Sequence, residues 1–355
     1  MVRPLNVLLV FLAPALVAAG LAVSPAAAQP KLSDEQRCTG GSGITPEAQV
    51  TACTALITGK RISRSNLAVV HTNRGVAYAR VANYDAAVAD FDAALRSNPN
   101  YVRATINRGS ANFARRDFDA AIADFSQAIK LNPKDATAYN SRGLALAERR
   151  DYDRALADYD AALKLDPKSA LAHLNRGLLF EGRADHDRAV AEFDAAVRLA
   201  PDNAVALSAR GVALGARGEF DRALADFDRA IALESDNANY FDHRGNIWRD
   251  RGRFERAVED YDKALALSPD FAFAYYNRAQ THYLAGRFKD ALADASKAAQ
   301  LNENAQALSL RGLIQEKLGA RDLAIADLRR ATELNPNLRQ ASEALLRLGL
   351  TGKLN

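Results

Sequence analysis

The chain has 355 residues, of which 48% are hydrophobic and 25% are charged, and its formal net charge is +4. This is the composition of a folded, soluble protein. The positive charge at first suggests nucleic-acid binding. However, Arg and Asp alternate along the sequence and form neither a basic stripe nor a basic tail, which argues against nucleic acid as a partner.

Residues 1–28 have the features of a secretory signal peptide. Arg3 supplies the positive start, an apolar run follows at residues 7–23, and three alanines at 26–28 form a small-residue cleavage site before Gln29. We therefore expect cleavage after Ala28, export to the periplasm of a Gram-negative bacterium, and no membrane span in the mature chain. The alternative is an uncleaved membrane anchor, because the apolar run approaches the length that spans a bilayer.

Residues 29–67 form an N-terminal segment that contains both cysteines of the chain, Cys38 and Cys53. Two cysteines in an exported protein most simply form one disulfide, and their spacing is neither that of a zinc site nor that of a CxxC redox pair. The alternative is two free buried thiols. Residues 46–58 are predicted to be the lone second helix of a degenerate leading repeat, and the disulfide would stabilise this end of the array.

From residue 68 onward the sequence repeats itself every 34 residues. The first half of each copy carries a small residue, which is glycine in the first six copies: Gly75, Gly109, Gly143, Gly177, Gly211 and Gly245. The second half carries two alanine columns, beginning at Ala87 and Ala94, with an aromatic column between them that begins at Phe91. A proline closes most copies, because it removes a backbone donor and restricts the residue before it.

The spacing of these columns predicts two packed helices in each copy. Alanine, aromatic and alanine follow one another at i, i+4 and i+7, which is one stripe of an α-helix, and the glycine lies on the matching stripe of the first helix. The pattern resembles the tetratricopeptide-repeat family. The resemblance implies an all-α, right-handed superhelical solenoid of about eight helix–turn–helix units.

The repeat grid predicts the division of the chain. The eight units are expected at 68–101, 102–135, 136–169, 170–203, 204–237, 238–271, 272–304 and 305–338. Residues 339–355 are expected to form a capping helix and a tail, because a solenoid needs a polar-faced end to remain soluble.

One column departs from the family, which usually has Leu just before the small residue. This chain has Arg there in every copy: Arg74, Arg108, Arg142, Arg176, Arg210, Arg244, Arg278 and Arg311. An acid follows each Arg after 16 residues: Asp90, Asp124, Asp158, Glu192, Asp226, Asp260, Asp294 and Asp327. This predicts an Arg–carboxylate pair inside each helical hairpin. The alternative is a ladder of anion-binding sites. Asn73, Asn107, Asn175 and Asn277 precede the Arg in four units and are expected to satisfy neighbouring polar groups.

By analogy with the family, the inner wall of the superhelix is the candidate binding surface. Its N-terminal half is apolar and includes Ile106, Phe113, Leu174 and Leu178. Its C-terminal half is polar and aromatic and includes Asn239, Asp242, Asn246, Arg249, Phe273, Tyr276, Gln280 and Tyr283. Aromatic and Arg side chains are frequent anchors of binding surfaces. The alternative for the aliphatic residues is packing between adjacent helices.

No catalytic, metal-binding or cofactor-binding motif is present in the sequence. The five histidines lack metal-ligand spacing, and the patterns GxSxG, GxxxxGK[ST] and HExxH are absent. The sequence therefore predicts a non-catalytic scaffold that binds a protein or peptide in its groove, without defining an oligomeric state. The alternative is a carbohydrate- or cell-wall-binding accessory module that uses the aromatic half of the groove.

Overall fold

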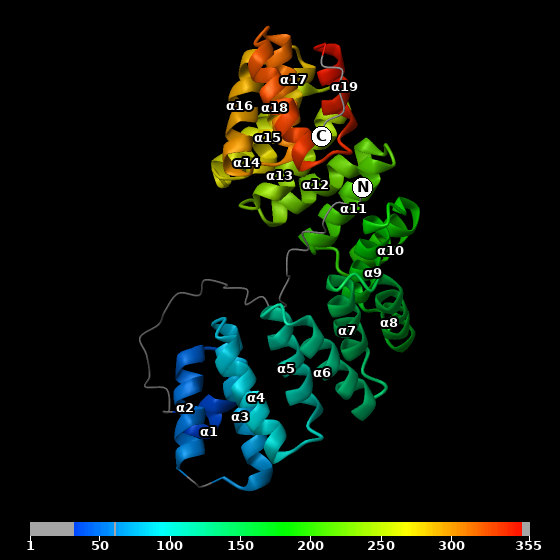
Figure 1. The fold of residues 1–355 in the computed structure, drawn as a ribbon. Coiled ribbons are helices and arrows are strands. Elements are labelled where there is room, and N and C mark those ends of the chain that lie inside the picture. The colour runs from blue at the N-terminus through cyan, green and yellow to red at the C-terminus, as the bar shows by residue number, and fades with distance from the viewer. Residues whose placement is uncertain (1–31, 60–61, 350–355) are drawn as a thin grey trace, which may run out of the picture. The chain divides into compact units, whose positions relative to one another are not determined.

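The computed structural model describes residues 32–59 and 62–349, which contain nineteen α-helices and no β-strand (Figure 1). The expected signal peptide at 1–28 and the end of the expected tail lie outside these residues. The chain divides into two compact units, here called the N-terminal unit, which ends at Ala184, and the C-terminal unit, which begins at Asp185. Each unit is described by itself.

The N-terminal unit contains nine helices. They are α1 (Asp34–Thr39), α2 (Pro46–Thr58), α3 (Arg64–Arg80), α4 (Tyr84–Ser97), α5 (Val102–Ala114), α6 (Phe118–Leu131), α7 (Ala136–Glu148), α8 (Tyr152–Leu165) and α9 (Ala170–Gly182). Helix α2 covers the residues predicted to be helical from the sequence, and α3 begins four residues before the expected start of the first repeat.

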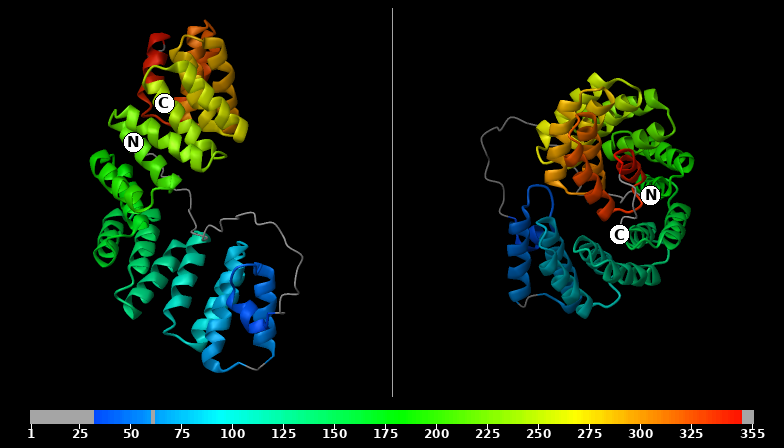
Figure 2. Two further views of the ribbon diagram at one scale, coloured as in Figure 1. Left: turned by 180° about the vertical axis from the view of Figure 1, so that it is seen from behind. Right: turned by 45° about the horizontal axis from the view of Figure 1, so that its top comes forward.

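The predicted disulfide between Cys38 and Cys53 is confirmed and joins α1 to α2. Both cysteines are buried in a cluster with Ala52 and with Val70 of α3. The side-chain amide of Gln49 also donates a hydrogen bond of 3.1 Å to the carbonyl oxygen of Cys38. The short helix α1 is therefore held on α2 and α3 by a covalent bond and by packing (Figure 2).

The C-terminal unit contains ten helices. They are α10 (His186–Leu199), α11 (Ala204–Ala216), α12 (Phe220–Leu233), α13 (Ala238–Asp250), α14 (Phe254–Leu267), α15 (Ala272–Leu284), α16 (Phe288–Leu301), α17 (Ala305–Lys317), α18 (Arg321–Leu334) and α19 (Arg339–Arg347).

Within each unit, consecutive helices pack as hairpins, and the hairpins stack on one another (Figure 1). From α3 onward the odd-numbered helices are the first helices of the hairpins and the even-numbered helices are the second. Each first helix also packs on the next first helix of its unit, as α13 does on α15. The first helices therefore form one continuous face in each unit, here called the first-helix face. The predicted all-α solenoid of helix pairs is confirmed.

The core of each hairpin explains the glycine and aromatic columns. A Cβ atom built on Gly75 would lie 2.6 Å from the ring of Phe91, and one built on Gly245 would lie 2.7 Å from the ring of Tyr261. Both rings are at most 1% exposed, and the alanines beside them are fully buried. Only glycine permits this close approach between helices without displacing the ring.

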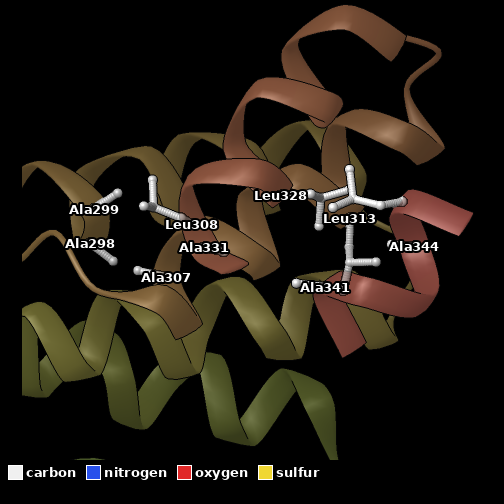
Figure 3. Close-up of a cluster of buried hydrophobic side chains, with 10 residues drawn as sticks. Ala298, Ala299, Ala307, Leu308, Leu313, Leu328, Ala331, Ala341 and Ala344 are labelled. Carbon is white, nitrogen blue, oxygen red and sulfur yellow. The ribbon is translucent and has the colours of Figure 1, made fainter. Parts of the chain in front are cut away.

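The last helix, α19, closes the C-terminal unit by packing on α17 and α18 (Figure 2). Its Ala341, Ala344 and Leu345 join a buried cluster with residues such as Leu313 and Leu328 (Figure 3). This arrangement covers an end of the hydrophobic core that would otherwise face water, as expected for a capping helix.

Candidate functional site

The Arg column forms bidentate ion pairs with the acid that follows it by 16 residues. Both oxygens of the carboxylate accept hydrogen bonds from one guanidinium in the pairs Arg74–Asp90, Arg108–Asp124, Arg142–Asp158, Arg210–Asp226, Arg244–Asp260, Arg278–Asp294 and Arg311–Asp327. The predicted pairing is thus confirmed at these seven positions. The eighth predicted pair consists of Arg176 and Glu192, which lie in different units.

A second acidic partner, which the sequence analysis did not predict, is present for Arg108, Arg210, Arg244 and Arg278. The remaining nitrogen of Arg210 donates to Asp194 at 2.8 Å, and that of Arg244 donates to Asp228 at 2.7 Å. These acids precede the Arg by 16 residues and belong to the second helix of the preceding hairpin. The recurrence of Asp160, Asp194, Asp228 and Asp262 at intervals of 34 residues was the signal that could have revealed them.

Each Arg with two acidic partners therefore connects two successive hairpins, and its guanidinium donates its hydrogen bonds to carboxylates of the same chain. Burial raises the pKa of Asp260, and its pairing with Arg244 only partly offsets this effect. The hydrogen bonds to Asp260 and Asp228 raise the pKa of Arg244. These contacts favour the structural interpretation of the Arg column over a ladder of anion-binding sites.

Polar side chains also connect neighbouring first helices. The amide of Asn175 on α9 donates a hydrogen bond of 3.0 Å to Asn140 on α7, and the amide of Asn277 on α15 donates one of 2.8 Å to Asp242 on α13. The expectation that Asn175 and Asn277 satisfy neighbouring polar groups is confirmed. These bonds fix the position of one first helix relative to the next.

In the N-terminal unit, the candidate residues lie largely within the packing of the helices. Phe113 and Leu174 are buried, whereas Ile106 and Leu178 are partly buried. The ring of Phe113 meets that of Phe118 edge to face at 5.4 Å, and Ile106 packs against the same cluster. These contacts favour the packing alternative for Phe113 and Ile106.

In the C-terminal unit, the polar candidates other than Asn239 form one hydrogen-bonded network on α13 and α15. Arg249 donates to Asn246 at 2.8 Å and to Gln280 at 3.1 Å. Asn246 also accepts from the hydroxyl of the buried Tyr261 at 3.0 Å. Asn239 lies at the start of α13, where its amide donates to Asn237. The network places Asn246, Arg249 and Gln280 side by side.

Asp242 lies beneath this network and is only 4% exposed. Its two oxygens accept hydrogen bonds from Asn277 at 2.8 Å and from Asn246 at 3.3 Å. Burial raises the pKa of Asp242, and the nearby charges of His243 and Arg249 only partly offset this effect. Its position makes it a support for the network and not a group that meets a ligand directly.

The aromatic candidates all lie on α15. Phe273 is 56% exposed and does not belong to the buried clusters that contain Tyr275, Tyr276 and Tyr283 of the same helix. Tyr276 and Tyr283 are partly buried against the clusters that α15 shares with α16–α19, and the ring of Tyr283 meets that of Phe288 at 5.5 Å. Phe273 is therefore the most accessible aromatic side chain of the candidate surface.

Within residues 32–59 and 62–349, no group of three or more His, Cys, Asp or Glu side chains has an arrangement that could hold a metal ion. No helix among these described residues has the length and apolar character needed to cross a membrane.

The stacked hairpins and their first-helix face define the chain as a helical-repeat scaffold. Models of the tetratricopeptide repeat match residues 72–136, 112–170, 140–204, 272–305 and 305–338, and a TPR repeat model matches residues 245–286. These matches together cover more than half of the chain, which therefore belongs to the tetratricopeptide-repeat family and is a protein-interaction scaffold. No curated protein sequence matches the chain.

Solved structures show the same fold. A tetratricopeptide repeat protein from Parabacteroides merdae is 20% identical with a TM-score of 0.59, and the match covers 70% of this chain and 99% of that one. PilW, described as a type IV pilus biogenesis factor, is 26% identical with a TM-score of 0.56, covering 59% of this chain and 98% of that one. The Cut9–Hcn1 structure matches with 14% identity and a TM-score of 0.62 over 89% of this chain and 62% of that one.

Proposed function

We propose that this protein is a non-catalytic scaffold of the bacterial cell envelope that binds a protein or peptide segment on the first-helix face of its C-terminal unit. The observation that carries the proposal is the exposure of Phe273, which is 56% accessible and lies on α15, the helix whose Gln280 belongs to the hydrogen-bonded network with Asn246 and Arg249. Exposed aromatic rings next to Arg and amide groups are typical of interaction surfaces. The eight repeats expected between residues 68 and 338 would supply the supporting framework.

Export to the periplasm is part of the proposal. It is supported by the signal features at residues 1–28 and by the Cys38–Cys53 disulfide, since disulfides persist in oxidising compartments. The similarity to PilW, a pilus biogenesis factor, is compatible with a role in an envelope assembly. The partner is proposed to be protein, with neither nucleic acid nor a cofactor involved.

Site-specific photo-crosslinking in the exporting cell tests the proposed surface. A photoreactive phenylalanine analogue would replace Phe273, and a matched control would carry it at Leu323, which is 61% exposed on the second helix α18. We expect a protein adduct at position 273 and none at 323. Equal adducts at both positions, or none at 273, would remove the support for this face.

A second candidate function is binding of a carbohydrate or cell-wall polymer. Phe273, Tyr276 and Tyr283 favour it, because aromatic rings stack on sugar rings and side-chain amides bind hydroxyl groups. Incubation of the purified mature protein with isolated cell-wall polymer distinguishes the two functions. We would accept the carbohydrate function in place of the proposed one if two results were obtained. The polymer would have to retain the protein but not the Phe273→Ser variant, and crosslinking at position 273 would have to give no protein adduct.

A further inference from the structure

We infer that the C-terminal unit binds an uncharged, extended polypeptide segment that carries two apolar side chains about five residues apart. This inference rests on the proposed function and specifies the partner of the same face. It depends on the side of α15 that includes Phe273, Tyr276, Gln280, Tyr283 and Leu284, here called the α15 stripe.

The two ends of the α15 stripe are apolar and accessible. Phe273 is 56% exposed and Leu284 is 54% exposed. They are eleven residues apart, which is close to three turns of an α-helix, so both lie on the same side of α15. At 1.5 Å per residue, their positions are separated by about 16 Å along the helix axis. The stripe therefore offers two separate apolar anchors.

Hydrogen bonds hold the surface between these anchors in place before any ligand arrives. Arg249 of α13 donates to Gln280 of α15, and Asn277 of α15 donates to Asp242 of α13. Both bonds connect the two first helices, and Asp242, the acceptor of the second one, is buried. A preorganised surface loses less conformational entropy on binding, which favours a short ligand.

The charged groups of this surface are already compensated within the chain. Arg249 pairs with Asp250 at 2.9 Å and donates its other hydrogen bonds to Asn246 and Gln280. Asp242 is buried and accepts from two amides. A ligand carboxylate would therefore meet no unpaired cation here, and a ligand ammonium group would meet no unpaired carboxylate. This balance favours an uncharged segment, because desolvating a charge without a partner is costly.

The polar groups between the anchors suit an exposed polypeptide backbone. The amide nitrogen of Gln280 and the hydroxyl of Tyr283 have no hydrogen-bond partner within the described residues. An extended segment presents free backbone N–H and C=O groups, whereas a helix has already used most of its own. At about 3.3 Å per residue, an extended chain spans about 16 Å in five residues. The geometry thus fits apolar side chains at positions i and i+5.

Peptides of varied spacing test this inference. Biotinylated, C-terminally amidated peptides Phe-(Ser)n-Leu, with n from one to eight, would be immobilised and titrated with the mature protein in a biolayer experiment. We expect the tightest binding at n of four. Phe273→Ser and Leu284→Ser should each weaken that binding by about tenfold or more, as for interface anchor residues. Leu323→Ser is the matched control for an exposed apolar residue and should change nothing.

Three outcomes would overturn the inference: binding that does not depend on n, binding that survives Phe273→Ser and Leu284→Ser together, or tighter binding when two serines are replaced by Glu or Lys. Circular dichroism of the variants checks that they are folded, which we expect because both side chains are largely exposed. If crosslinking at position 273 captures a protein while peptide binding shows no spacing preference, the inference fails and the proposed function stands.

Discussion

The hairpin turns in the first half of the repeat array differ from those in the second half. The first four turns place a residue other than glycine in the left-handed region: Ala82, Arg116, Arg150 and Ala184, with φ between 56° and 63°. The last four place glycine there: Gly218, Gly252, Gly286 and Gly319, with φ between 74° and 78°. The residue that follows, which caps the second helix, differs as well.

The capping residue is Asn or Asp after each of the first four turns. Asn83, Asp117 and Asp185 accept a hydrogen bond from a backbone N–H in the first turn of α4, α6 and α10. After the glycine turns the capping positions are Glu219, Arg253, Arg287 and Ala320, and none of them makes a side-chain cap bond.

The comparison shows two local solutions to the same turn. A left-handed non-glycine residue costs about 1–2 kcal/mol, and an Asn or Asp cap contributes about 1 kcal/mol. In the first half the left-handed residue carries the backbone cost, and the capping side chain forms its hydrogen bond at every turn except that of Asp151. In the second half glycine avoids the backbone cost, and the side-chain cap is absent. The fold therefore requires the turn geometry and leaves open how the sequence stabilises it.

The largest effect is expected from comparing one Arg–Asp pair in each half whose arginines differ in their second partner. Arg210 contacts Asp194 in addition to Asp226, whereas Arg142 has only the hydroxyl of Ser126 in addition to Asp158. Removing the acid of a buried pair leaves a poorly compensated charge and costs about 3 kcal/mol or more. Asp158→Ala should therefore reduce the free energy of unfolding more than Asp226→Ala does.

Urea denaturation followed by circular dichroism measures this difference. A double-mutant cycle with Arg142→Ala and Arg210→Ala isolates the pair energies, which we expect to be about 1–3 kcal/mol. Coupling energies indistinguishable from zero would show that the Arg column does not stabilise the hairpins.

The repeat periodicity is sufficient to predict the helix pairs and the seven Arg–Asp pairs, because both follow from residues at fixed spacing, and the disulfide follows from the presence of two cysteines in a chain with signal-peptide features. The second acid of Arg210 and Arg244 does not follow from the spacing within one hairpin, because it lies on the second helix of the preceding hairpin. The roles of Asp242 and Phe113 could not be predicted, since whether a side chain is buried or accessible depends on the exact packing of adjacent first helices. Leu284 is not predicted, because the analogy with the family places its neighbour Tyr283 on the inner wall.

The next effect is expected from exchanging the turn residues. Gly252→Ala introduces a side chain at φ 74°, where a Cβ would meet no atom within 4 Å, so the cost is confined to the backbone. We expect a loss of about 1 kcal/mol. The reciprocal Ala82→Gly, at φ 56°, should stabilise by a smaller amount, because glycine also gains entropy in the unfolded chain. Urea denaturation measures both changes: the midpoint should fall for Gly252→Ala and rise for Ala82→Gly. Shifts of the same sign would contradict the proposed difference between the two kinds of turn.

A comparable effect is expected from exchanging the caps. Arg253→Asn supplies the missing cap of α14 in a turn that already has glycine, and it should stabilise by about 0.5–1 kcal/mol. Asp117→Ala removes the cap of α6 and should destabilise by about 1 kcal/mol. Hydrogen exchange of the first-turn amides of α14 and α6 would locate both changes. Unaltered protection in both variants would show that the caps do not distinguish the two halves.

The smallest effect concerns the pH dependence of a charged cap. Hydrogen bonds from the side chain and the backbone N–H of Arg188 lower the pKa of Asp185 in the folded chain. Because the folded pKa of Asp185 is depressed, the stabilising contribution of its charge is present above the unfolded value of about 3.9 and is lost as the pH falls through the folded value.

Asp185→Asn keeps a capping oxygen but has no charge, so this variant isolates the electrostatic part of the contribution. We expect a higher urea midpoint for the unsubstituted protein at pH 7 and a smaller difference between the two midpoints at pH 3. A difference of the same size at both pH values would mean that the charge of Asp185 does not contribute. The uncharged cap of α4, Asn83, offers the matched control, because Asn83→Ser should shift the midpoint equally at both pH values.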